Sequence, residues 1–204
     1  MNDLTLQKAR AYEAEHGAAI SPEERPAYHM TPYVGWLNDP TVSLIIKGSI
    51  TSSISITPTM CGGRPCTGVT RSAPTCCTGS ICPVHSPRIP RRTTAPAAFS
   101  GSATEMDDGK QLLMYTSVVA EKQPNGEMRD IQTQSIAIGD GLDYEKPACN
   151  PVLTQKDLPE GYSKFDFRDP KIWREADGTY SAVTVALTED GQRCSRTVPK
   201  QGRF

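Results

Sequence analysis

Two aspartates, each followed by a proline, are the residues of this chain whose type and setting could do chemistry. Asp39 lies in the string WLNDP at 36–40 and Asp169 in FRDP at 167–170, while a third string, FSGSA, occupies 99–103. Carboxylates serve enzymes as nucleophiles and as acids or bases. An Asp in a turn before Pro is, however, more often a turn or cap residue. Each string alone is therefore a weak signal, and their order and spacing are what favour a shared site.

Taken together, the three strings resemble those of glycoside hydrolase family 32, the sucrose and fructan hydrolases. The likeness covers residues 25–40 and 99–192, about half of the chain. The N-terminal domain of that family is a five-bladed β-propeller with a funnel-shaped active site. The resemblance therefore implies an all-β fold, here a partial and truncated five-bladed β-propeller. It also implies a glycosidase that cleaves terminal β-D-fructofuranosides, namely sucrose, sucrose 6-phosphate or short fructans.

The resemblance also implies a role for each motif residue. Asp39 would be the nucleophile, and Asp169 would stabilise the oxocarbenium-like transition state while Arg168 orients its carboxylate. The residues expected to bind the sugar are Trp36, Leu37, Asn38, Phe99, Ser100 and Arg168. For Ser100 a strand end with a small-residue turn is an equally good interpretation. Asp166 and Asp143 match no family motif, and we expect both to be solvated.

A retaining glycosidase needs a second carboxyl group beside its nucleophile. The two groups lie roughly 5–5.5 Å apart, and the second protonates the leaving oxygen. In family 32 this general acid is a Glu in a Glu-Cys motif, and the sequence contains no such pair. We therefore expect the chain as written to be inactive and the true protein to extend beyond Phe204. The alternatives are a non-catalytic fragment that binds fructose or sucrose, and a pseudogene product without function.

Composition and charge narrow the classes of binding partner to expect. With 22 Lys+Arg against 23 Asp+Glu, the net charge of -1 gives no reason to expect nucleic acid or an anionic membrane surface. No apolar run approaches the roughly 20 residues of a membrane-spanning helix. The N-terminus is charged where a signal peptide would be apolar. We therefore expect a cytoplasmic protein with a small-molecule partner. The resemblance implies that this partner is a sugar substrate and that no cofactor is needed.

The cysteines crowd one stretch without the pattern of a site. Seven are present, and five of them are Cys61, Cys66, Cys76, Cys77 and Cys82. No C-x-x-C pair occurs and only His85 is nearby, so we predict no metal site. A disulfide framework is not expected either, because the chain has no export signal and is larger than the scaffolds that need one.

Local patterns predict the organisation of the chain. Residues 4–16 mix apolar and charged positions, which predicts a short amphipathic helix ending near Gly17. We expect a helical cap over 1–24 and the partial propeller domain over 25–204. Asn38-Asp39-Pro40 predicts a turn at a strand end. After Phe99, short strand-like stretches recur at regular spacing, as is typical of a sandwich, barrel or propeller.

Residues 41–98 depart from the family pattern. They contain no aromatic residue and are rich in Thr, Ser, Pro, Arg and Cys. Deletion of the first A of an Asn codon after Pro40 converts codons for NGFSYYKGQYHLFYQYHPYDV into codons for TVSLIIKGSITSSISITPTMC at every position. We therefore predict a reading-frame shift over about 41–98 and another after about residue 192, covering 193–204. Such a shift explains the cysteine cluster, and it leads us to expect that the first blade does not form natively.

Overall fold

The structure is a computed structural model that describes most of the backbone. Its described residues are 4–26, 31, 34, 36–46, 49–57, 67–73, 80–84, 97–140, 143–191 and 193–198. Side chains are described for 11–26, 31, 34, 98–140, 143–163 and 165–191. Within these ranges the chain is almost entirely β, with one α-helix, two short 3-10 helices and eleven strands. The all-β expectation is thus confirmed.

The N-terminal helix forms where the sequence predicts it. Helix α1 spans Leu4–Gly17, and a 3-10 turn, η1, follows at Pro22–Glu24. The Glu24 carboxylate accepts a hydrogen bond from the backbone N–H of Ser21 at 3.0 Å, which closes the start of that turn. The apolar residues of α1 are spread around the helix, so the expected amphipathic pattern is absent. Among the described residues, no helix is long and apolar enough to cross a membrane.

The strands form three antiparallel sheets in which each strand pairs with the next along the chain. The first sheet contains β1 (Trp36–Ile46), β2 (Ser49–Thr57), β3 (Thr67–Ala73) and β4 (Ser80–Val84). The second contains β5 (Ala97–Glu105), β6 (Gln111–Lys122), β7 (Met128–Gly139) and β8 (Tyr144–Glu145). The third contains β9 (Tyr162–Arg174), β10 (Tyr180–Thr188) and β11 (Arg193–Val198).

The first sheet differs from two sequence-based expectations. Four strands pair between residues 36 and 84, where we expected no native blade. This segment retains strand propensity, because β2 reads SITSSISIT and is rich in β-branched residues. The predicted turn at 38–40 is also wrong, since β1 runs through it without a break. The turn signal becomes an irregularity instead: the pairing with β2 shifts register on both sides of Pro40, which has no N–H to donate.

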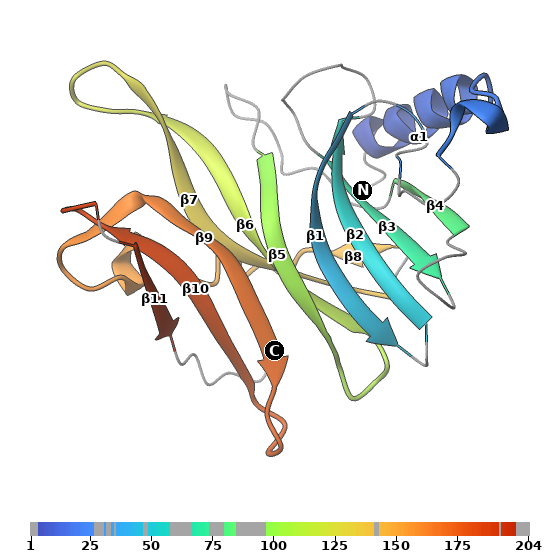
Figure 1. The fold of residues 1–204 in the computed structure, drawn as a ribbon. Coiled ribbons are helices and arrows are strands. Elements are labelled where there is room, and N and C mark those ends of the chain that lie inside the picture. The colour runs from blue at the N-terminus through green and yellow to red at the C-terminus, as the bar shows by residue number, and fades with distance from the viewer. Residues whose placement is uncertain are drawn as a thin grey trace.

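The first strands of the three sheets lie side by side. Strand β5 contacts β1 on one side and β9 on the other, and Figure 1 shows it in green between blue β1 and orange β9. The remaining strands of each sheet follow outward from this row. Residues on these three strands can therefore share one site, although β1 and β9 are more than one hundred positions apart in the sequence.

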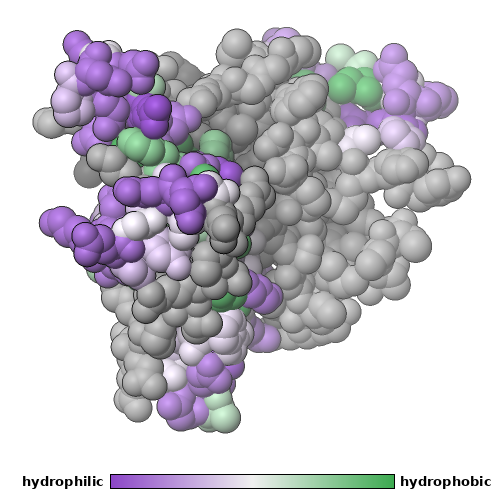
Figure 2. Space-filling view, turned by 60° about the vertical axis from the view of Figure 1, so that its left-hand side comes forward, coloured by the Kyte–Doolittle hydropathy of each residue, from purple (hydrophilic) through white to green (hydrophobic). Residues whose placement is uncertain are grey.

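The second and third sheets share one hydrophobic core. Its buried members are Leu112, Met114, Ile136, Val152, Leu153, Phe167, Ile172, Tyr180, Ala182 and Ala186. Strand β10 shows the expected period of two, because Tyr180, Ala182, Thr184 and Ala186 are all buried. On the face seen in Figure 2, hydrophilic side chains predominate among the coloured residues, and hydrophobic ones form only small groups.

Removing one core side chain tests this packing. Leu112 is fully buried, so Leu112→Ala should lower the free energy of unfolding by about 2–5 kcal/mol. Met128 is 53% exposed, and Met128→Ala is the matched control, with an expected change within about 0.5 kcal/mol. Urea denaturation of the chain measures both values. Equal effects of the two substitutions would contradict the assigned core.

Candidate active site

The three motif strings lie on the three adjoining first strands. WLNDP opens β1, FSGSA lies within β5, and FRDP lies within β9. For Trp36, Leu37, Asn38 and Asp39 the structure describes the backbone, and their side chains lie outside the described residues. The position of the Asp39 carboxylate relative to Asp169 therefore stays a prediction. The other motif residues, Phe99, Ser100, Arg168 and Asp169, are described in full.

Asp169 occupies a β-bulge with a left-handed backbone. Its φ of 58° falls in the region that L-residues other than glycine rarely adopt. The pairing with β10 shifts register here: Val183 lies opposite Lys171 and Val185 opposite Arg168, so two residues of β9 face one of β10. Bulges of this kind re-aim a side chain and recur beside active sites.

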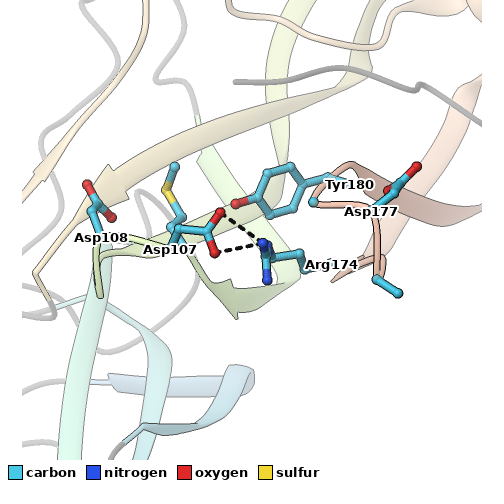
Figure 3. Close-up of a pocket in the computed structure, with 8 residues that line it drawn as sticks. Asp107, Asp108, Arg174, Asp177 and Tyr180 are labelled. Atoms are coloured by element: carbon cyan, nitrogen blue, oxygen red, sulfur yellow. Dashed lines mark hydrogen bonds and ion pairs between the residues drawn. The ribbon is translucent and has the colours of Figure 1, made fainter.

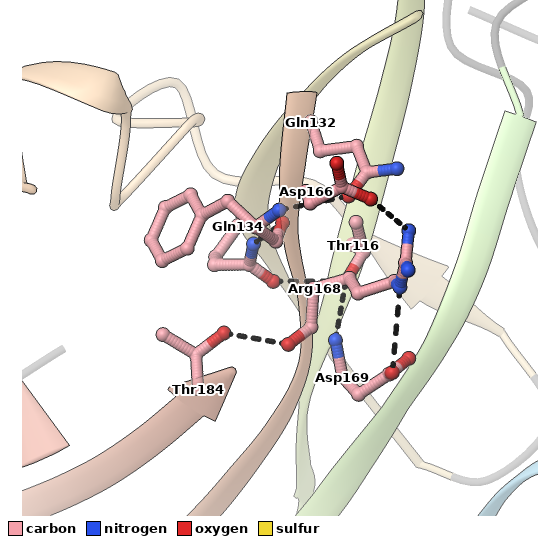
Figure 4. Close-up of polar contacts among 8 residues, drawn as sticks. Thr116, Gln132, Gln134, Asp166, Arg168, Asp169 and Thr184 are labelled. Carbon is pink, nitrogen blue, oxygen red and sulfur yellow. Dashed lines mark hydrogen bonds and ion pairs between the residues drawn. The ribbon is translucent and has the colours of Figure 1, made fainter. Parts of the chain in front are cut away.

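The bulge changes which side chains can meet. In a regular strand Arg168 and Asp169 would point to opposite faces. Here the Nε atom of Arg168 lies 3.9 Å from Oδ2 of Asp169, and its Nη1 atom lies 3.1 Å from Oδ1 of Asp166 (Figure 4). The guanidinium thus lies between two carboxylates. The Asp169 side chain is 52% exposed, so a ligand can reach it from solvent.

Asp166 is a residue that sequence reasoning missed. We expected it to be solvated, but its ion pair with Arg168 makes it part of the candidate site. The spacing of Asp166 and Arg168 could have indicated this contact, because residues two apart on a strand share a face. Arg168 also contacts Asp169, at a longer distance than it contacts Asp166, and its orienting role stays a prediction.

Side chains from the second sheet hold the backbone before the bulge. The N–H of Phe167 donates to Oε1 of Gln132 at 2.9 Å, and its carbonyl accepts from Nε2 of Gln134 at 2.7 Å. The N–H of Asp169 donates to Oγ1 of Thr116 at 3.0 Å. All three side chains are buried. The strand is therefore fixed by polar groups that the second sheet presents to it.

Two hydroxyl groups hold the backbone after and beside the bulge. Ser102 on β5 donates to the carbonyl of Pro170 at 2.9 Å and accepts from the N–H of Ile172 at 2.7 Å. Thr184 on β10 donates to the carbonyl of Arg168 at 2.8 Å. Sequence reasoning missed these buried polar residues because polar positions that alternate with apolar ones on a strand usually face water.

Phe99 and Ser100 lie beside the same point. Strand β5 carries its own bulge, since Phe99 pairs with Thr116 and Gly101 pairs with Tyr115, which leaves Ser100 as the extra residue. A Cβ atom on Gly101 would lie 2.0 Å from the carbonyl oxygen of Met114, so the motif requires glycine there. The FSGSA and FRDP strings thus meet at Thr116. Both Phe99 and Ser100 are half-buried.

A second polar hollow lies at the far end of β9, roughly 16 Å along the strand from Asp169. It measures about 510 Å³ and lies between the turns that follow β5 and β9. Arg174 contacts both carboxylate oxygens of Asp107, at 2.6 and 2.8 Å, and Tyr180 lies beside this pair (Figure 3). Burial raises the pKa of the Tyr180 hydroxyl above its ordinary value. The ion pair connects the second and third sheets.

No group of three or more His, Cys, Asp or Glu that could hold a metal ion occurs among the described residues. Cys149 is exposed and has a free thiol. The side chains of the five clustered cysteines, Cys61 to Cys82, lie outside the described residues.

Comparison with solved structures defines the class of fold. The chain is similar to a GH32 beta-fructofuranosidase from Bombyx mori, with a TM-score of 0.79 and 28% identity over 97% of this chain and 40% of that one. A mutant of the same enzyme in complex with sucrose gives a TM-score of 0.77 and 26% identity. The chain thus has the all-β architecture of this β-propeller class of glycosidases.

Comparison of sequences identifies the family. The profile of the glycosyl hydrolases family 32 N-terminal domain matches residues 87–195, which include FSGSA and FRDP. The chain is 33% identical to a sucrose-6-phosphate hydrolase from Bacillus subtilis and 31% identical to beta-fructofuranosidase, insoluble isoenzyme 2, from Oryza sativa subsp. indica, each over 196 residues. These alignments cover 93% and 91% of this chain but 37% and 31% of the relatives. The chain belongs to glycoside hydrolase family 32.

The left-handed backbone of Asp169 leads to a stability prediction. Asn tolerates this conformation, so Asp169→Asn should leave the free energy of unfolding within about 0.5 kcal/mol of the parent. Asp169→Val should lower it by about 1–3 kcal/mol, because a β-branched residue is strained at this φ. Chemical denaturation of both variants measures the difference. A Val variant as stable as the Asn variant would argue against the bulge.

Proposed function

We propose that the protein to which this chain belongs hydrolyses terminal β-D-fructofuranosides, with sucrose, sucrose 6-phosphate or short fructans as substrates. The chain spans about a third of the length of the curated relatives it matches. Three facts support the proposal: membership of family 32, the names of the relatives, and the placement of WLNDP, FSGSA and FRDP on adjoining strands. The last of these carries the proposal, because it would bring both aspartates to one fructosyl unit.

The proposed chemistry is a retaining double displacement. Asp39 attacks the anomeric carbon of the fructosyl unit while a general acid protonates the departing oxygen. The same residue, now a carboxylate, then takes a proton from water, which attacks the fructosyl-enzyme and frees Asp39. Asp169 accepts hydrogen bonds from fructose hydroxyls, and its negative charge favours the oxocarbenium-like transition state. Arg168 and Asp166 hold the Asp169 carboxylate in place.

We also propose that the 204-residue chain by itself does not turn over substrate. The family's general acid is the Glu of a Glu-Cys motif, and no such pair occurs in this sequence. Without that acid the leaving group departs unprotonated, which removes a contribution to the rate of typically about 10²–10⁴-fold.

The proposed propeller would be five-bladed, and the three sheets described above would supply its first three blades.

Replacement of the proposed nucleophile tests the function. In the full-length protein with the reading frame restored both through codons 41–98 and after codon 192, Asp39→Asn should reduce sucrose hydrolysis by at least about 10³-fold, because an amide cannot form the fructosyl-enzyme. Asp143→Asn is the matched control, since Asp143 is exposed and matches no family motif, and it should leave the rate unchanged. The assay measures released fructose.

Three outcomes of this assay are distinct. Parent-like hydrolysis by the Asp39→Asn variant would end the assignment of the nucleophile. Saturable fructose binding without turnover, measured by calorimetry on the parent protein, would favour a non-catalytic sugar-binding protein. Absence of both binding and turnover would favour a product without function.

The proposed frame shifts lead to a prediction about the gene. Independent determination of the nucleotide sequence should add one A directly after codon 40 and restore the frame just before the codon of Phe99. The translated segment would then read NGFSYYKGQYHLFYQYHPYDV after Pro40, with the aromatic residues that residues 41–98 lack. A gene sequence that encodes TVSLIIKGSI as printed would contradict the proposed shift.

A further inference from the structure

We infer that Thr116, oriented by Gln134, is a positioning residue that sets the backbone of Asp169 and thereby aims its carboxylate. The inference rests on the function proposed above, in which Asp169 contacts the sugar. Thr116 and Gln134 belong to no string of the family resemblance. Their side-chain polar atoms bond to each other and to the backbone of β9, including the N–H of Asp169.

Thr116 and Gln134 form a cross-strand pair on the second sheet. They lie directly opposite each other in the register of β6 and β7, and both are 0% exposed. The Thr116 hydroxyl donates to Oε1 of Gln134 at 3.0 Å, and Nε2 of Gln134 donates to the carbonyl of Phe167 at 2.7 Å. The pair therefore presents an amide donor and a hydroxyl acceptor side by side to β9.

The order of donors and acceptors fixes what Thr116 can do. A hydroxyl has one proton and two lone pairs. Because the Thr116 hydroxyl donates its one hydrogen bond to Oε1 of Gln134, the lone pairs of Oγ1 are left to accept the N–H of Asp169 at 3.0 Å. The pair thus holds two points of β9, the carbonyl of residue 167 and the N–H of residue 169, from one rigid sheet (Figure 4).

These two points lie directly before the Cα atom of the residue that turns the chain. Asp169 lies in the left-handed region, where a residue with a Cβ atom is held only by its surroundings. Without the acceptor on Thr116, its N–H would lose its described partner, and the bulge would relax toward ordinary strand geometry. The carboxylate would then swing away from Arg168, which lies on the other face of a regular strand.

A displacement of this kind affects rate more than binding. A shift of about 1 Å at a reacting centre can lower catalysis by roughly 10²-fold. In the full-length, frame-restored protein, Thr116→Val should therefore lower kcat for sucrose by about 10- to 100-fold with a smaller change in KM. Thr116→Ser retains the hydroxyl and should retain most of the parent kcat. Thr116→Cys, a weaker acceptor, should fall between the two.

Two controls separate positioning from a general loss of structure. Ser117→Ala removes a buried hydroxyl from the next position of β6, where it donates to Ser135 rather than to β9, and it should leave kcat unchanged. In an Asp169→Ala background, Thr116→Val should have no further effect on kcat, because Thr116 acts through Asp169. An additional loss of the full size in that background would overturn the inference.

The failure of this inference differs from the failure of the proposed function. If Asp169→Ala hydrolyses sucrose at the parent rate, the proposed role of Asp169 is wrong and the inference ends with it. If Asp169→Ala is impaired while Thr116→Val and Thr116→Cys both match the parent, only the positioning role is wrong. Should the Val variant fail to fold, the ratio of the Cys and Ser variants decides, and equal kcat values overturn the inference.

Discussion

The constraint on which the candidate site depends is that strand β9 cannot complete a regular hydrogen-bond ladder where it carries Asp169. The left-handed residue and the proline after it interrupt the pairing with β10. A buried backbone group without a partner costs about 1–3 kcal/mol. The neighbouring strands supply side chains in place of the ladder, from Ser102, Thr116, Gln132, Gln134 and Thr184. The interface of the second and third sheets is therefore polar around the bulge and apolar around Leu112 and Ile136.

The same constraint explains why the site forms between sheets. The bulge of β9 and the bulge of β5 meet at one residue, since Thr116 pairs with Phe99 and accepts the N–H of Asp169. Each bulge places a polar residue, Ser100 on β5 or Asp169 on β9, outside the regular alternation of side chains. Hydrogen bonds between the second and third sheets hold both strands. Side chains held by packed, hydrogen-bonded neighbours keep their geometry, which is what stabilisation of a transition state requires.

Prediction from sequence succeeded where a local pattern determines the structure. Helix α1, the strands after Phe99 and the family could all be inferred from residue order alone. Tertiary context decided the rest. Asn38-Asp39-Pro40 carries a turn signal, but pairing with β2 keeps it extended. Gln134 has the pattern of a surface residue, yet it is fully buried and donates to the carbonyl of Phe167 on β9. Residues 41–98 contain enough β-branched residues for strands, which the comparison of motifs did not predict.

The most direct test of this account is a crystal structure of the full-length protein with fructose bound. The account predicts that the Asp39 and Asp169 carboxyl groups contact the same sugar ring from adjoining strands β1 and β9, with the N–H of Asp169 on Thr116. Carboxyl groups on opposite sides of the molecule, or a sugar bound away from both, would contradict it.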